Sequence, residues 1–245
     1  MTLAELPRSA TAAPANFAWP PGTAPSVRHD VHAPRDEELR VLKKIGTTLK
    51  IARNQTIFNE GDRADHAYRL MSGVVRLCKH MADGRRQIVQ FVFPGDFFSF
   101  MELKGHQLSA EAVSDVTLTC YSQRQIAQLG KDMPEIREHF LNLLSQRLLR
   151  MHDHLIMLGR QTATERVTTF LVLLAERIGT SKDKALDVAM SRQDMADYLG
   201  LTIETVCRIL SKLKRRLIID VPDLHTLTLR NVAAIRALAE GDEEI

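Results

Sequence analysis

Cysteine is scarce in this chain, whose 245 residues include only Cys78, Cys120 and Cys207. An iron–sulfur cluster bound by cysteine alone needs four thiolates, so the composition excludes a cluster of that kind. We interpret Cys78 and Cys120 as small residues buried in strands, because free cysteine is among the most buried residue types.

Metal ligands and catalytic groups are sparse as well. Cys78 and His80 form a pair without a third ligand, whereas a structural zinc site needs four. His152 and His154 are two residues apart and point in different directions on a helix. No nucleophile–base arrangement stands out, and no spacing supports a haem site. The sequence therefore predicts no metal, no cofactor and no enzymatic activity.

Long apolar runs are missing. No run approaches the roughly 20 residues of a transmembrane helix, and the N-terminus lacks the charged-then-apolar pattern of a signal peptide. We expect a cytoplasmic protein with no membrane partner. The formal net charge of +3 does not by itself identify a nucleic-acid binder. The length and the 44% hydrophobic content fit two domains.

Proline is concentrated at the N-terminus, where residues 1–34 hold six of the nine prolines. Many alanines accompany them, and apolar periodicity is weak. We therefore expect residues 1–34 to form a flexible tail without a core.

Residues 47–121 alternate short strand-like runs with turn dipeptides. The runs 74–79 and 87–93 are rich in β-branched and aromatic residues. The turn dipeptides are Gly61–Asp62, Ser72–Gly73, Asp83–Gly84 and Pro94–Gly95. Many short antiparallel strands indicate a barrel or jelly roll, which we assign to residues 35–131. Arg85 and Arg86 are expected at an exposed hairpin end.

A long helix is predicted over residues 132–160, with Pro134 in its first turn. Apolar residues then recur in steps of three and four, an a/d seam of about two and a half heptads. The seam consists of Leu141, Leu144, Leu148, Met151, Leu155 and Leu158. We expect the seam to pair with a second copy in a two-fold dimer. Packing on the chain's own β-domain is the alternative, and the two are compatible.

The segment from Ser191 to Lys214 predicts two short helices around Gly200, a helix-turn-helix. Thr202 and Thr205 offer N-cap chemistry to the second helix, from about Ile203. One stripe of that helix is expected to be buried, comprising Ile203, Val206, Leu210 and Leu213. An amphipathic helix over 165–177 precedes the motif, after which comes a polar loop at 179–185. Two apolar runs around Pro222–Asp223 follow it and predict a β-hairpin wing.

The opposite face of the second helix carries Glu204, Cys207, Arg208 and Ser211. Arginine can bind guanine O6 and N7 in a bidentate manner, and a carboxylate can accept from the cytosine N4 amine. An exposed salt bridge between Glu204 and Arg208 would explain the pair without DNA, but their place at the start of a recognition helix favours base reading. Phosphate contacts are expected from Arg192, Thr202, Thr205, Ser211 and Lys212, with Lys214, Arg215 and Arg216 adding positive charge.

These features resemble the Crp/Fnr transcription regulators over residues of about 36 to 238. Residues 204–208 look like the Glu-x-x-Ser-Arg pattern of the family's Fnr and FixK branches, with Cys207 in place of serine. The resemblance implies an α+β chain made of an N-terminal cyclic-nucleotide-binding-like β-roll, a long dimerisation helix and a C-terminal winged helix-turn-helix over 161–245. Glu60–Gly61–Asp62 and Phe93–Asp96 would occupy turns of the roll.

The same resemblance, closest to the FixK-like branch without cluster cysteines, implies function. It implies a homodimeric activator that binds palindromic TTGA-type half-sites on double-stranded DNA and works with RNA polymerase. Its targets would be genes of microaerobic respiration or nitrogen fixation.

Cyclic nucleotide is not an expected ligand of the roll. Nucleotide-binding relatives supply a Gly-Glu and an Arg-Ser or Arg-Thr pair, whereas this chain has Gly95–Asp96 and then Gln107-Leu108-Ser109-Ala110. Leu108 cannot pair with a phosphate, although Arg85, Arg86 or Arg124 would supply a cation. The alternative function is a sensor whose roll binds another small molecule and switches DNA affinity.

Cys207 raises a separate question because its thiol is expected on the groove-facing side of the recognition helix, beside Arg208. Oxidation there would place bulk and negative charge against DNA. A neutral, serine-like contact is the equally weighted alternative.

Overall fold

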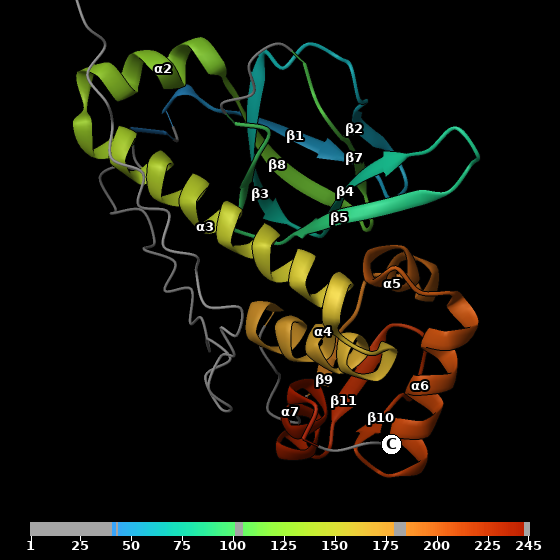
Figure 1. The fold of residues 1–245 in the computed structure, drawn as a ribbon. Helices are drawn as coiled ribbons and strands as arrows, with labels where there is room; N and C mark the ends of the chain where they lie inside the picture. The colour runs from blue at the N-terminus through green and yellow to red at the C-terminus, as the bar shows by residue number, and fades with distance from the viewer. Residues whose placement is uncertain (1–40, 43, 101–104, 179–184, 243–245) are drawn as a thin grey trace, which may run out of the picture. The chain divides into compact units, whose positions relative to one another are not determined.

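The computed structural model describes residues 41–42, 44–100, 105–178 and 185–242 (Figure 1). The tail predicted for residues 1–34 lies outside this part of the chain, as does most of the predicted polar loop at 179–185.

The predicted β-roll is confirmed, as two four-stranded antiparallel sheets (Figure 1). The first sheet has the order β1 Thr47–Ile51, β8 Val116–Ser122, β3 His66–Ser72 and β6 Phe97–Phe98. The second has the order β2 Thr56–Phe58, β7 Ser109–Ala112, β4 Val75–His80 and β5 Arg86–Val92. Apolar side chains alternate inward along β3 and β8, where Leu70 and Leu118 are fully buried. The rings of Phe58, Tyr68 and Phe98 all pack against one another, with 5.3 to 6.2 Å between centroids.

Gly73 turns the chain between β3 and β4 with a φ of +85°. A Cβ atom there would lie 2.3 Å from the Asp115 carbonyl oxygen, so the turn requires glycine for space as well as for conformation.

Two helices follow the roll. The first, α2 Gln123–Asp132, lies within the predicted roll domain, where the sequence analysis assigned no helix. The second, α3 Pro134–Arg160, is the predicted long helix with proline at its start. Ile136 and Phe140 of α3 pack against the roll.

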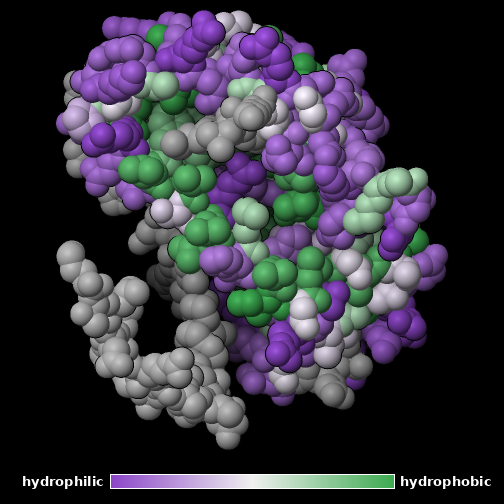
Figure 2. All heavy atoms as spheres, turned by 45° about the horizontal axis from the view of Figure 1, so that its top comes forward, coloured by the Kyte–Doolittle hydropathy of each residue, from purple (hydrophilic) through white to green (hydrophobic). Residues whose placement is uncertain are grey.

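The predicted seam on α3 stays largely exposed within one chain. Five of its six residues are exposed, from 40% for Leu144 to 69% for Leu155. Leu158 is half-buried beside α5, where a Cβ on Gly200 would lie 3.3 Å from the Leu158 Cδ2 atom. The chain's own β-domain therefore does not cover most of the seam. Figure 2 shows apolar side chains among polar ones on the face that α3 crosses.

The C-terminal part contains four helices and a small sheet among its described residues. They are α4 Ala163–Ile178, β9 Ala185–Asp187, α5 Arg192–Leu199, α6 Ile203–Arg215, β10 Ile219–Asp220, β11 Thr226–Leu229 and α7 Val232–Glu240. The sheet order is β10-β11-β9, which confirms the predicted wing and adds a third strand. Placing Ala185 in a loop was wrong, because it begins β9 and pairs with Thr228. The helix α7 was not predicted.

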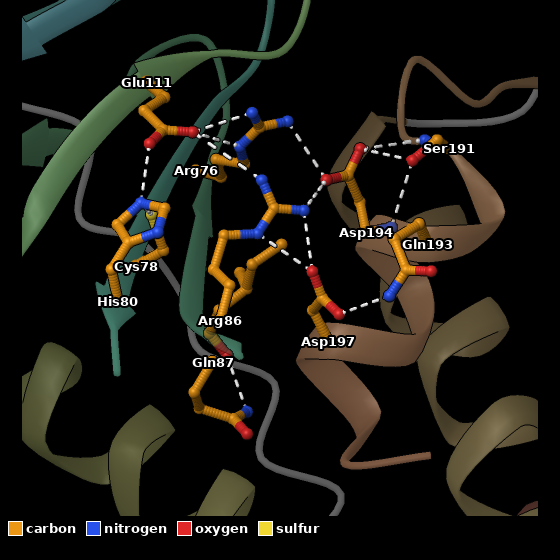
Figure 3. A network of polar contacts seen from close by, with 11 residues as sticks. Arg76, Cys78, His80, Arg86, Gln87, Glu111, Ser191, Gln193, Asp194 and Asp197 are labelled. Atoms are coloured by element: carbon orange, nitrogen blue, oxygen red, sulfur yellow. Dashed lines mark hydrogen bonds and ion pairs between the residues drawn. The ribbon is translucent and has the colours of Figure 1, made fainter. Parts of the chain in front are cut away.

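Buried ion pairs link the roll to α5 (Figure 3). We call this set the roll–helix network; it consists of Arg76, Arg86, Glu111, Asp194 and Asp197. Arg76 donates to Glu111 Oε2 at 2.8 Å and to Asp194 Oδ1 at 3.0 Å. Arg86 donates to Asp194 Oδ1 at 2.7 Å and to Asp197 Oδ2 at 2.9 Å. Arg76 thus links Glu111 of the roll to α5, and Arg86 of the roll pairs with two carboxylates of α5.

The placement of Arg86 corrects the sequence analysis. Its side chain is only 17% exposed, whereas that of its neighbour Arg85 is 77% exposed. The prediction of an exposed hairpin end therefore holds for Arg85 and is wrong for Arg86. Burial opposes the charge of Arg86, but its carboxylate partners outweigh burial and raise its pKa.

The network predicts different effects of substituting these two arginines. Arg86→Gln leaves Asp197 without its cation and Asp194 with only Arg76, so we expect a loss of about 3 kcal/mol in the free energy of unfolding. Arg85→Gln is the matched control and should unfold like the wild type, because both Arg85 and its partner Asp83 are exposed. Urea denaturation of both variants tests this. Equal stabilities would mean that the network contributes nothing.

Candidate nucleic-acid interface

Helix α5 begins with reciprocal capping. The Ser191 hydroxyl accepts from the Asp194 amide at 3.0 Å, and the Asp194 carboxylate accepts from the Ser191 amide at 3.1 Å. Asp194 is the third helical residue, so this arrangement is a capping box. Its carboxylate also lies near the positive end of the helix dipole, which stabilises the charge.

The turn to α6 has the predicted form. Gly200 adopts the left-handed conformation, with φ 62° and ψ 39°. Thr202 is the N-cap of α6, and its hydroxyl accepts from the Thr205 amide at 3.3 Å. Hydrogen bonds from its own backbone amide and from Thr202 lower the pKa of Glu204, so that side chain is ionised at neutral pH.

Helix α6 separates an apolar face from an exposed face. Val206, Leu210 and Leu213 are buried as predicted, while Ile203 is only half-buried and Ile209, which the sequence analysis omitted, is buried. The exposed face carries the predicted set Glu204, Cys207, Arg208 and Ser211. A carboxylate and a guanidinium one turn apart on an exposed helix are suited to reading base edges.

The predicted phosphate-binding residues lie in two kinds of environment. Thr202 and Ser211 are exposed, whereas Arg192, Thr205 and Lys212 are half-buried. Burial lowers the pKa of Arg192, and a Coulombic interaction with Cys207 partly opposes this effect. Arg192 of α5 thus lies close enough to the recognition helix for its charge to interact with the Cys207 thiol.

The wing is joined to α6 by polar contacts. Lys214 of α6 donates to the Val221 carbonyl at 3.0 Å, and within the wing Arg230 donates to Asp220 at 2.9 Å. Lys214, grouped by sequence with the phosphate-binding cations, therefore fixes the wing against the end of α6.

Two further helices hold α5 in place. The His154 ring of α3 stacks on Tyr198 with 4.2 Å between ring centroids, and its Nε2 lies 2.9 Å from the Tyr198 carbonyl oxygen. Burial lowers the pKa of His154. Arg166 of α4 donates to the carbonyls of Leu158 and Leu199, at 2.8 and 3.1 Å. The helix-turn-helix is thus supported from the roll, from α3 and from α4.

The turn of the roll at Gly95–Asp96 is engaged by the C-terminal part. Asp96 accepts from the Phe93 amide at 3.0 Å and forms an ion pair with Arg177 of α4. Leu108 is half-buried against the core of the roll, and Gln107 is exposed. Arg86, one of the three arginines that would supply a cation to a nucleotide phosphate, already pairs with Asp194 and Asp197.

The environments of the thiols also differ. Cys78 is fully buried in β4, and burial together with Glu111 raises the pKa of its thiol to about 12. Cys120 is half-buried, and burial raises its pKa. Cys207 is exposed. The interpretation of Cys78 and His80 as a pair without a third ligand was wrong, because Glu111 places a carboxylate oxygen 2.9 Å from His80 Nε2.

Sequence reasoning missed the residues that position the interface, namely Asp194, Asp197, His154, Tyr198 and Arg166. Asp194 carried a usable signal, since Ser191 and Asp194 have capping-box spacing. The others depend on contacts between segments distant in sequence, which no local pattern reveals.

No helix in the described ranges is both long and apolar enough to span a membrane.

Both parts of the chain match known protein families. Residues 48–132 match the cyclic nucleotide-binding domain, and residues 165–238 match the Crp-like helix-turn-helix domain. The nitrogen fixation regulation protein FixK of Azorhizobium caulinodans is 43% identical over 210 residues, which cover 83% of this chain and 84% of that protein. The transcriptional activatory protein AadR of Rhodopseudomonas palustris is 31% identical over 223 residues, covering 85% and 92%.

A solved structure agrees with the two family matches and with the similarity to FixK. The structure of FixK2 from Bradyrhizobium japonicum matches with a TM-score of 0.76 and 32% identity, covering 79% of this chain and 97% of that one. With both domains matched and FixK proteins similar over most of its length, the chain belongs to the Crp/Fnr family of transcription regulators, in its FixK-like branch.

Proposed function

We propose that this protein is a homodimeric, sequence-specific transcription activator that binds palindromic DNA. The observation that carries the proposal is the exposed face of α6, where Glu204 and Arg208 stand one turn apart at the start of a recognition helix. Relatives named as nitrogen fixation regulation proteins and as a transcriptional activatory protein support activation of nitrogen-fixation genes. Microaerobic respiration genes as alternative targets, and joint action with RNA polymerase, are the part of the proposal that the resemblance to the FixK-like branch implies.

The proposed dimer rests on the seam of α3. A single chain exposes a row of apolar residues along about four turns of α3, and a second copy would cover it in a coiled-coil arrangement. A two-fold axis along the seam would present two recognition helices to half-sites about 10 to 10.5 base pairs apart. Similarity to the Fnr and FixK branches favours TTGA-type half-sites.

We do not propose a cyclic nucleotide as effector. By the resemblance, Leu108 takes the place of the arginine that nucleotide-binding relatives use, and its side chain packs against the roll core. Asp96 is already paired with Arg177. A roll that switches DNA affinity through another small molecule is the second candidate. A ligand that shifts the melting temperature of the full-length protein would support it.

Base reading is tested by comparing Arg208→Ala with Lys212→Ala on specific and random duplexes. Arg208→Ala should cost about 1 to 3 kcal/mol on the specific site and little on random DNA, because it removes a base contact. Glu204→Ala should relax the preference at one base pair. Lys212→Ala, a phosphate contact, should weaken both complexes alike. Fluorescence anisotropy measures each affinity, and equal losses for Arg208→Ala on both duplexes would place it off the bases.

Assembly is tested with the double variant Leu148→Ser/Leu155→Ser. Polar groups in the middle of the seam should dissociate the dimer and abolish tight binding to the full palindrome, because one subunit contacts only one half-site. Leu173→Ser in α4 is the control, since Leu173 is also an exposed leucine but lies outside the seam. Sedimentation velocity at low micromolar concentration reports the mass, and a double variant that remains dimeric contradicts the seam.

Control by oxidation is tested at Cys207, which is exposed and near Arg192. Oxidation to sulfenic acid would add bulk facing the phosphates, and oxidation to sulfinic acid would add a negative charge as well. Peroxide should therefore weaken DNA binding by the wild type and spare Cys207→Ser. Gel-shift titrations on one palindromic site compare the two. An equal loss in both proteins, or none in the wild type, would leave Cys207 as a serine-like contact.

A further inference from the structure

Three potential metal ligands converge at the roll end of the roll–helix network (Figure 3). Cys78 and His80 lie two residues apart on β4, and Glu111 lies on the neighbouring strand β7. The Cys78 Sγ and His80 Nε2 atoms are 3.6 Å apart, and His80 Nε2 and Glu111 Oε1 are 2.9 Å apart. All three ligating atoms lie within 4.8 Å of one another.

These separations fit a tetrahedral zinc ion closely. Zinc–sulfur and zinc–nitrogen bonds of about 2.3 and 2.0 Å at the tetrahedral angle separate the two ligand atoms by about 3.5 Å. The same geometry separates nitrogen and oxygen ligands by about 3.4 Å, so Glu111 Oε1 would retreat by about half an ångström. The cation would replace the direct contact between His80 Nε2 and Glu111 Oε1.

The charge around the three ligands also suits a dication. Arg76 and Arg86 supply two positive charges, and the three carboxylates of the network supply three negative ones. A Cys78 thiolate would make the net charge minus two, which a divalent cation neutralises. Glu111 would use Oε1 for the cation while Oε2 stays with Arg76 at 2.8 Å.

We propose that Cys78, His80 and Glu111 bind a thiophilic divalent cation of the Zn²⁺ class, with water as the fourth ligand. A set of one sulfur, one nitrogen and one oxygen selects such an ion over Mg²⁺ or Ca²⁺, which prefer oxygen alone. The His80 side chain is 53% exposed, so the cation reaches the buried thiol past the imidazole. The bound ion shares Glu111 with the network that holds α5.

The test uses Co²⁺ as a spectroscopic probe of the full-length protein, purified without a histidine tag and kept reduced. Binding should produce a thiolate-to-cobalt charge-transfer band and tetrahedral d–d bands, saturate at one ion per chain, and disappear when Zn²⁺ is added. Absence of these bands at tenfold excess of Co²⁺ would overturn the proposal.

Variants assign the ligands. His80→Gln, at a position whose side chain is half-exposed, should weaken Co²⁺ binding by about tenfold or more. Cys78→Ser should remove the charge-transfer band, and Cys207→Ser, which alters the exposed thiol, should leave it unchanged. A band that persists in Cys78→Ser, or one that disappears in Cys207→Ser, would place the cation elsewhere and overturn the site.

Discussion

The carboxylate of Asp194 takes part in two structures at once, and the position of the DNA-binding helices depends on both. Within α5 it closes the capping box with Ser191, and across the chain it accepts from Arg76 and Arg86. The side chain is only 5% exposed, so its charge depends on these partners in place of water. Because α5 packs against α6, the same contacts that anchor α5 also set where Glu204 and Arg208 are presented.

Much of this architecture could be predicted from sequence because its signals are local. The strands of the roll follow alternating apolar residues and turn dipeptides, α3 begins at Pro134, and α6 begins after Gly200 and the Thr202 cap. The exposed face of α6 follows from helical periodicity alone.

Three of the errors share one physical cause, which is that the environment of a residue depends on its tertiary partner. Arg86 follows a hairpin turn and an exposed arginine, so its sequence context predicts exposure, yet two aspartates from α5 cover it. Glu111 completes the Cys78–His80 group only because β7 pairs with β4. Ala185 enters a strand because β11 provides its hydrogen-bond partners. In each case the deciding neighbour lies far away along the chain.

That separation along the chain has a kinetic consequence. The ion pairs of Asp194 with Arg86 and Arg76 join residues 108 and 118 positions apart, while the roll and the helix-turn-helix each close over shorter distances. Closing so long a loop costs conformational entropy. The ion pairs offset this cost only after the roll and α5 have each formed. We therefore expect docking of α5 on the roll to be a late event in folding, and weakening it to accelerate unfolding more than it slows folding.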